Sequence, residues 1–277
     1  MPTSSSFADL HIHTHYSDGT LSPQQVVGEA IARGLSCISI TDHDTVDGVC
    51  PTQKAAEKFS LEVVSGIELS SEWQGKDIHV LGYFVSLSNG ELKQKLDQIQ
   101  ETRLNRIHEM IRKLKEQGID NISFEEVCRL SESKAVGRPH LAFVLQQKGW
   151  VSSLREAFEK YLGENCPAYV AKYKQTPYEA IELMGKSGGV AVLAHPMITN
   201  KDELIPSFVE AGLKGLEVHY PNYSSNVISY YENIARKYNL VMTGGSDSHG
   251  AAKESTFIGK VKVPYAVVEE LRALAGT

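Results

Sequence analysis

Short apolar runs alternate with helix-like spacing over the first 89 residues. Four runs have the length and the apolar content of strands, at residues 7–12, 37–40, 61–69 and 78–84. The stretch after the first run starts at Ser22-Pro23, a typical helix start, ends at Gly34 and carries apolar residues at helical spacing, namely Val26, Val27, Ala30 and Ile31. Another helix is expected over residues 51–59. Strands that alternate with helices predict an α/β fold with a parallel sheet.

Between about residues 90 and 188 the apolar spacing is helical only. Apolar positions from Leu92 to Leu114 predict one long amphipathic helix that ends near Gly118. Ser123-Phe124-Glu125-Glu126 has the pattern of a capping box that opens another helix. Further helices are expected at residues 139–148, 153–162 and from residue 176 onward. This region is therefore interpreted as a helical insert.

The strand pattern then returns. Apolar runs at residues 189–194, 215–220 and 240–244 predict three more strands, with helices expected at residues 224–238 and 265–274. The sheet is thus built from both ends of the chain, and the helical region lies between the two parts.

Residues that can bind metals follow these strands. His11 and His13 project from the same face of the first strand, because side chains two residues apart point the same way. Asp18 follows in a Gly-containing turn. Other strand ends carry comparable groups, namely Asp42, His43 and Asp44, then Glu68, His79, His195, Asp247 and His249. A mixed imidazole and carboxylate set favours Mn, Fe, Zn or Mg. The alternative is that the histidines are solvated loop residues. Asp42 and Asp44 either orient imidazoles or cap turns.

Composition narrows the class of protein. The formal charge of −6, from 28 Lys and Arg against 34 Asp and Glu, argues against tight wrapping of duplex nucleic acid and favours small partners. No apolar run approaches the roughly 20 residues that span a bilayer, and Met1 to Ser6 lacks the features of a signal peptide. A cytoplasmic protein without a membrane partner is therefore expected. The four cysteines lack Cys-x-x-Cys spacing, which favours buried thiols over disulfides.

Two segments of the helical region are candidate substrate contacts. In Gly137-Arg138-Pro139-His140, a guanidinium and an imidazole beside a helix start could grip a phosphate oxygen. The alternative is a capped helix with surface charges. The stretch from Tyr169 to Lys174, which includes Lys172, is a second candidate lining, although interleaved aromatics and lysines often only cover a surface.

Taken together, these motifs resemble the PHP domain family, the polymerase and histidinol phosphatase superfamily of metal-dependent phosphoesterases. The resemblance is carried by Asp9-Leu10-His11-Ile12-His13, Ser17-Asp18-Gly19, Ile40-Thr41-Asp42-His43-Asp44, Gly66-Ile67-Glu68, Ala194-His195-Pro196 and Gly245-Ser246-Asp247-Ser248-His249. It implies a distorted (β/α)7 barrel, similar to a TIM barrel, formed by residues 1–89 and 189–277. Residues 90–188 would then be an inserted helical subdomain that covers the site. Within the family, the chain is most similar to the branch that hydrolyses 3′,5′-bisphosphonucleotides and short RNA ends.

The resemblance also implies a centre of three divalent metals, with Mn²⁺ the expected ion and Fe²⁺, Zn²⁺ or Mg²⁺ as alternatives. The implied ligand sets are His11, His13, Glu68 and Asp247; Glu68, His79 and His195; and Asp18, His43 and His249. Glu68, Asp247 and His195 are the expected catalytic residues, and Arg138, His140 and Lys172 the expected substrate contacts.

The expected activity is that of a hydrolase that removes phosphate from a small nucleotide or a short RNA 5′ end. Alternatives are a histidinol-phosphate phosphatase, a hydrolase of the amidohydrolase type, and a non-catalytic module that binds metal or nucleotide. A monomer or weak oligomer is expected.

Overall fold

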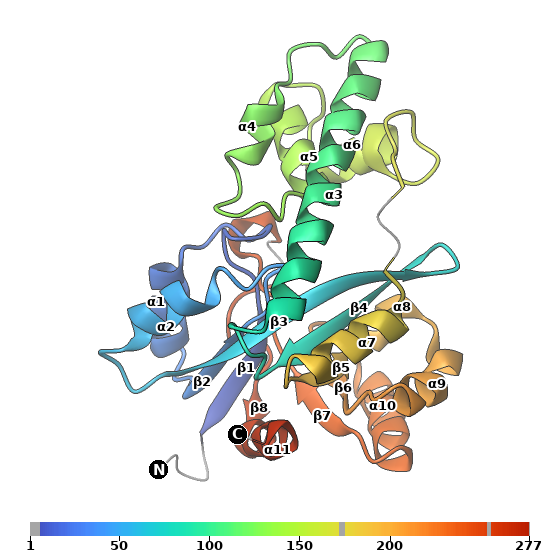
Figure 1. Ribbon diagram of the computed structural model, residues 1–277. Coiled ribbons are helices and arrows are strands. Elements are labelled where there is room, and N and C mark those ends of the chain that lie inside the picture. The colour runs from blue at the N-terminus through green and yellow to red at the C-terminus, as the bar shows by residue number, and fades with distance from the viewer. Residues whose placement is uncertain (1–5, 172–174, 254–255, 277) are drawn as a thin grey trace.

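The computed structural model describes residues 6–171, 175–253 and 256–276, in which one eight-stranded sheet is surrounded by helices (Figure 1). The strands are β1 (Phe7–Ile12), β2 (Cys37–Ile40), β3 (Glu62–Trp73), β4 (Lys76–Tyr83), β5 (Val190–Leu193), β6 (Gly215–His219), β7 (Val241–Gly244) and β8 (Val263–Pro264). The α-helices are α1 (Pro23–Ala32), α2 (Val49–Ala56), α3 (Gly90–Glu116), α4 (Phe124–Cys128), α5 (Arg138–Gln147), α6 (Leu154–Ala157), α7 (Pro177–Lys186), α8 (Pro196–Thr199), α9 (Ile205–Glu210), α10 (Ser225–Lys237) and α11 (Ala266–Ala275). A short π-helix at Phe158–Leu162 continues α6. None of the described helices is both long enough and apolar enough to cross a membrane.

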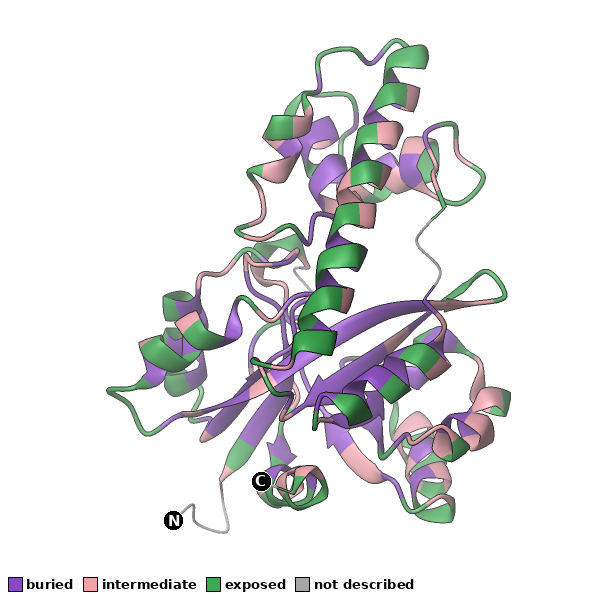
Figure 2. Ribbon diagram, viewed as in Figure 1, coloured by how far each residue is buried: buried purple, intermediate pink, exposed green. Residues whose placement is uncertain are grey.

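The sheet curls into a nearly closed barrel. Its strand order is β7-β6-β5-β4-β3-β2-β1-β8, and a bridge between Ile12 and Ser248 links the end of β1 to the segment after β7. The short β8 runs antiparallel to β1. Helices cover the outside, so the strands are buried (Figure 2). The predicted TIM-like barrel with a helical insert is confirmed.

Besides β8, strand β4 also differs from the prediction of parallel strands. β4 is antiparallel to both of its neighbours, β3 and β5. The connection from β3 to β4 is only Gln74-Gly75, and both residues have positive φ, as a two-residue hairpin requires. Because β4 is reversed, His79, near its start, lies beside Ser70 and faces the same end of the barrel as the carboxyl ends of the parallel strands.

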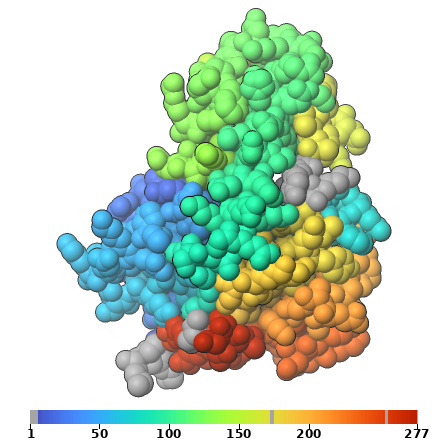
Figure 3. Space-filling model, in the orientation of Figure 1, coloured from blue at the N-terminus to red at the C-terminus, as the bar shows by residue number. Residues whose placement is uncertain are grey.

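The helical insert has a core of its own. Leu92 and Leu96, in the first part of α3, pack with the residues that cover the barrel, whereas Ile107 and Leu114 pack with α4, α5 and α6. The insert projects above the barrel in Figure 3. Helix α7, which the expected boundaries place in the insert, packs against β3, β4 and β5 instead. Helix α7 thus contacts the barrel strands, and the boundaries of the insert at residues 90 and 188 stay a prediction.

Gly245 allows the barrel to close. It follows β7, and a Cβ at this position would lie 2.3 Å from the backbone nitrogen of His11 and 2.4 Å from the His11 Cβ. The neighbouring Ser246 N–H donates to Asp9 on β1 at 2.8 Å. Only glycine therefore lets this segment approach β1 closely enough to bring Asp247 beside His11.

We predict that Gly245→Ala lowers the free energy of unfolding by about 1–3 kcal/mol, because the added methyl forces backbone apart. Denaturant unfolding measures this change. Gly28→Ala in α1 is the matched control, since a Cβ there meets nothing within 4 Å, and it should leave the protein equally or more stable. A Gly245→Ala variant as stable as the unchanged protein would contradict the role given to this contact.

Candidate metal centre

Nine ionisable side chains meet at one end of the barrel. Most come from the end of a strand or from the loop that follows it, whereas Glu68 lies within β3, not at its end as expected, and His79 lies within β4. They are His11, His13, Asp18, His43, Glu68, His79, His195, Asp247 and His249. The nine residues expected from separate motifs therefore lie together, as far as the described structure places them.

Their ligand atoms fall into overlapping groups. The atoms of His11, His13, Glu68 and Asp247 all lie within 4.8 Å of one another, as do those of His43, Glu68 and His79. A third group, whose ligand atoms also lie within 4.8 Å of one another, contains His13, Asp18, His43 and His249. His195 Nε2 lies 3.0 Å from Glu68 Oε1, and His79 Nδ1 lies 2.8 Å from the same oxygen. Glu68, His13 and His43 therefore each belong to two of these three groups.

Glu68 lies at the centre of this cluster. Its side chain is 1% exposed, and its second oxygen, Oε2, lies 3.1 Å from both His11 Nε2 and His13 Nε2. Burial alone would raise its pKa, but the neighbouring His11 and His79 outweigh burial and hold the pKa well below the usual range. Glu68 is thus a carboxylate with two oxygens directed at different histidines. A carboxylate placed in this way could share its two oxygens between cations.

His43 is held neutral. Burial lowers its pKa to about 3, although Glu68 and Asp18 oppose the shift. A neutral imidazole keeps a lone pair for a metal.

Glu217 on β6 is a functional candidate that the sequence interpretation missed. Its Oε1 lies 2.8 Å from His11 Nδ1, and its Oε2 accepts the backbone N–H of His195 at 2.8 Å. The side chain is fully buried. It therefore orients His11 so that Nε2 faces Glu68 and His13. A carboxylate behind a metal-binding histidine fixes the tautomer of the ring in this way.

The two aspartates of the Asp42-His43-Asp44 segment hold loops. Asp42 accepts from Thr14 N–H, Thr14 Oγ1 and Ser17 Oγ, which fixes the turn that carries Asp18. Asp44 accepts from Ser70 N–H and pairs with Arg103 of α3. For Asp42, the turn-capping alternative therefore describes the observed bonds.

Two residues of the cluster have strained backbones. His195 has φ of 28° and Asp247 has φ of 47°, both in the left-handed region that non-glycine residues rarely adopt. Such conformations cost about 1–3 kcal/mol each and persist where the surrounding structure enforces them. Here they turn two side chains from the ends of β5 and β7 into the cluster.

The expected substrate contacts have separate outcomes. His140 is buried and uses both ring nitrogens within the protein: Nδ1 accepts from Gly137 N–H, and Nε2 lies 2.7 Å from Ser17 O. As described, it has no ring nitrogen left for a phosphate; it joins the insert to the metal-site loop. Arg138 lies over the rings of Phe158 and Tyr169 and 3.7 Å from Asp77. Lys172 lies outside the described residues.

A cavity of about 430 Å³ opens over the cluster. Lys253 and Tyr220 also line this cavity. Neither residue was predicted from the sequence to lie at the site. Lys253 Nζ lies 3.1 Å from Tyr220 Oη, and it also contacts the Asp247 carboxylate. Apolar side chains from both the insert and the barrel complete the wall, namely Pro139, Leu154, Phe158, Ile198 and Ala252.

The side chains fit a cluster of divalent metals. Among the described residues, several buried atoms of the cluster have no hydrogen-bond partner, namely Nδ1 of His13, His43 and His195 and Oδ1 of Asp18. Buried polar atoms are rarely left unpaired, so these atoms need another partner. Imidazole nitrogens and carboxylate oxygens without thiolates suit hard or borderline divalent cations. A barrel with such a cluster at its strand ends defines the class of metal-dependent hydrolases.

Comparison with known proteins identifies the family. The PHP domain family model matches residues 9–103. The 5′-3′ exoribonuclease of Haemophilus influenzae is 32% identical over 247 residues, which cover 87% of this chain and 89% of that protein. The 3′,5′-nucleoside bisphosphate phosphatase of Chromobacterium violaceum is 30% identical over 257 residues, covering 91% and 90%. The chain therefore belongs to the PHP domain family.

Solved structures agree. A structure from Bifidobacterium adolescentis, described as that of a metal-dependent phosphoesterase, superposes with a TM-score of 0.89 at 27% identity and covers 98% of this chain and 96% of its own. A structure of an amidohydrolase from Chromobacterium violaceum with bound sulfate has a TM-score of 0.85 at 30% identity and covers 96% of each chain. The chain is a metal-dependent phosphoesterase that uses divalent metals.

Proposed function

We propose that this enzyme removes a phosphate from a nucleoside 3′,5′-bisphosphate at a centre of three divalent metals, with Mn²⁺ as the expected ion. Short RNA 5′ ends are a further expected substrate. The observation that carries the proposal is the convergence of nine imidazole and carboxylate side chains at one end of the barrel, under a cavity that is also lined by Lys253. The names of the relatives from Haemophilus influenzae and Chromobacterium violaceum support the nucleotide substrate.

The three groups of ligand atoms favour three metal positions. We assign His11, His13, Glu68 and Asp247 to the first; Glu68, His79 and His195 to the second; and Asp18, His43 and His249 to the third. When bound, divalent cations neutralise phosphate charge and lower the pKa of a coordinated water from 15.7 toward about 7, which supplies a nucleophile at neutral pH.

The protein's own residues set the geometry of this reaction. Glu68 holds the ligand groups together through its two oxygens, while Glu217 fixes His11. Lys253 lines the cavity, and its ammonium group can donate a hydrogen bond to a phosphate oxygen. Tyr220 positions that ammonium through its hydroxyl. Burial and the neighbouring Asp247 raise the pKa of Tyr220 far above its usual value, so the phenol stays protonated and can donate.

Phosphate release from a panel of substrates tests the proposal. The protein is reconstituted with Mn²⁺ and assayed on adenosine 3′,5′-bisphosphate, AMP, histidinol phosphate and a five-nucleotide RNA, with the metal-free protein as the blank. We expect the bisphosphate to have the highest kcat/KM. A preference for histidinol phosphate would assign the alternative phosphatase activity. No release from any substrate would favour the non-catalytic module.

Arg138 provides a prediction on substrate binding. Because its guanidinium lies over the ring of Phe158, which lines the cavity above the cluster, we expect Arg138→Ala to raise KM about fivefold and to change kcat little, as loss of uniform binding does. Steady-state kinetics on the preferred substrate measure both constants. Arg155→Ala on α6 is the control, because that side chain is 87% exposed. A normal KM for the Arg138 variant would remove Arg138 from the substrate contacts.

A further inference from the structure

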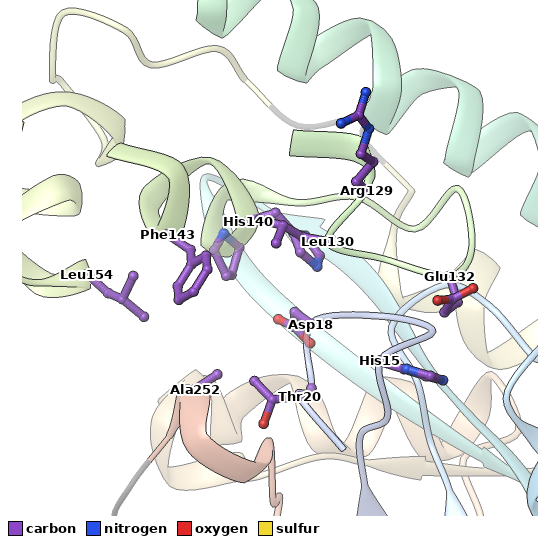
Figure 4. A pocket seen from close by; sticks show the side chains of 12 residues that line it. His15, Asp18, Thr20, Arg129, Leu130, Glu132, His140, Phe143, Leu154 and Ala252 are labelled. Carbon is purple, nitrogen blue, oxygen red and sulfur yellow. The ribbon is translucent and has the colours of Figure 1, made fainter. Parts of the chain in front are cut away.

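A second cavity of about 300 Å³ lies beside the metal centre, between the insert and the barrel (Figure 4). It shares four lining residues with the cavity over the cluster, namely Asp18, Pro139, Leu154 and Ala252. The two cavities are therefore neighbours on either side of Asp18. A substrate whose phosphate lies at the cluster can extend into this second cavity.

The wall of the second cavity is held in place by bonds between the insert and the barrel loop after β1. Glu132 N–H donates to His15 O at 2.9 Å, and Ser131 Oγ donates to Tyr16 O at 3.1 Å. His140 Nε2 lies 2.7 Å from Ser17 O. Three consecutive carbonyl groups of the loop thus hold the insert. The cavity is preformed, as small-molecule sites usually are.

The wall of the second cavity combines apolar and polar side chains. In Figure 4 the side chains of Phe143 and Leu154, from the insert, lie opposite Thr20 and Ala252 of the barrel. Phe143 is 39% exposed although it is a large apolar ring. Glu132 and His15 lie at the other end of the cavity and supply polar groups. An apolar wall with an aromatic ring and polar groups at one end suits a flat heterocycle that stacks on its face and forms hydrogen bonds at its edge.

We infer that this cavity binds the nucleobase of the substrate, with Phe143 as the stacking residue. The inference rests on the proposed function, because the phosphate at the cluster places the rest of the nucleotide next to Asp18. It makes the enzyme selective for nucleotides over sugar phosphates that lack a base. Phe143 contacts the base and is not one of the metal ligands.

Kinetics with a matched pair of substrates test the inference. Adenosine 3′,5′-bisphosphate is compared with the abasic 1-deoxyribose 3,5-bisphosphate, in the Mn²⁺-loaded protein. For Phe143→Ala we expect KM for the nucleotide to rise about tenfold, as loss of one stacking contact does, with kcat unchanged and with KM for the abasic compound unchanged. Phe143→Leu, which keeps an apolar side chain, should give a smaller rise. Phe59→Ala is the control, because Phe59 is 54% exposed just beyond α2 and does not line the cavity.

Binding of adenosine alone gives a readout without metals or turnover. In saturation-transfer NMR the base protons should receive magnetisation from the unchanged protein and from Phe59→Ala, and lose it in Phe143→Ala. Retained transfer in Phe143→Ala, or an equal rise of KM for both substrates, would overturn the base cavity. If the unchanged protein hydrolyses neither compound yet transfers magnetisation to adenosine, the proposed reaction fails while the base cavity stands.

Discussion

Exchanging Glu68 for Gln is expected to lower kcat/KM at least about a hundredfold and to reduce the bound metal per chain. Outer-sphere partners of metal ligands already contribute 10–100-fold, and Glu68 is assigned to the ligand sphere itself. A glutamine keeps the shape but removes the negative charge, and its NH₂ group cannot bind a cation. The two histidines near Oε1 and the three near Oε2 would lose their shared anion.

Phosphate release and elemental analysis of the dialysed protein measure the two effects of Glu68→Gln. Circular dichroism checks that the barrel remains folded. Glu57→Gln is the matched control, since Glu57 is an exposed residue at the end of α2. Unaltered turnover with normal metal content would remove Glu68 from the centre and, with it, the assignment of the shared bridge.

The arrangement of the cluster follows from the positions of its residues along the chain. Asp18, His43 and His195 come just after apolar runs, and parallel strands bring their carboxyl ends to one edge of the sheet. The two-residue period of a strand places His11 and His13 on one face. Strand ends therefore indicated several of the groups that come together, whereas the full set of nine came from the resemblance to the PHP family.

The hairpin and the insert boundary depend on information that hydrophobic spacing does not contain. Gln74-Gly75 is a weak hairpin signal, because Asn-Gly or Asp-Gly would favour this turn more strongly. The same apolar run fits a parallel or an antiparallel strand. Likewise, α7 has an apolar face whether it covers the insert or the barrel. Only the three-dimensional partners decide both points.

His140 shows the limit of interpreting a motif by its residue types. An imidazole beside a helix start can bind phosphate, yet here the ring accepts the Gly137 N–H and lies against Ser17 O. Burial lowers its pKa, so the ring is neutral and can accept at one nitrogen while it donates at the other. The contact across 123 residues could not be inferred from local sequence.

Glu217 was missed because it has no companion motif. It stands alone between Leu216 and Val218, where alternation marks it only as one more strand position. A usable signal was present nonetheless. A carboxylate inside an apolar strand is costly to bury unless it is hydrogen-bonded, and this indicates a partner such as a histidine or a backbone N–H.

Glu217→Gln is expected to weaken metal binding by about 10–100-fold and to lower activity to a similar extent, although the residue is assigned to no metal. Both groups that face Glu217 are donors: the backbone N–H of His195 and, with His11 ligating through Nε2, the Nδ1–H of His11. A glutamine has one oxygen for these two donors. Its NH₂ group then faces Nδ1 and favours the tautomer that carries the proton on Nε2, which is the nitrogen directed at Glu68. The wrong nitrogen of His11 is protonated, so the metal must compete with a proton.

Metal titration separates this effect from simple destabilisation. A buried donor left unsatisfied costs about 1–3 kcal/mol, so the free energy of unfolding of the metal-free Glu217→Gln protein should fall by that amount. Glu232→Gln on α10, which pairs with Arg236 at the helix surface, is the matched control and should keep normal metal affinity. If Glu217→Gln lowers stability but binds metal as tightly as the unchanged protein, Glu217 supports the barrel alone and does not orient His11. If metal affinity falls as well, Glu217 orients His11 for metal binding.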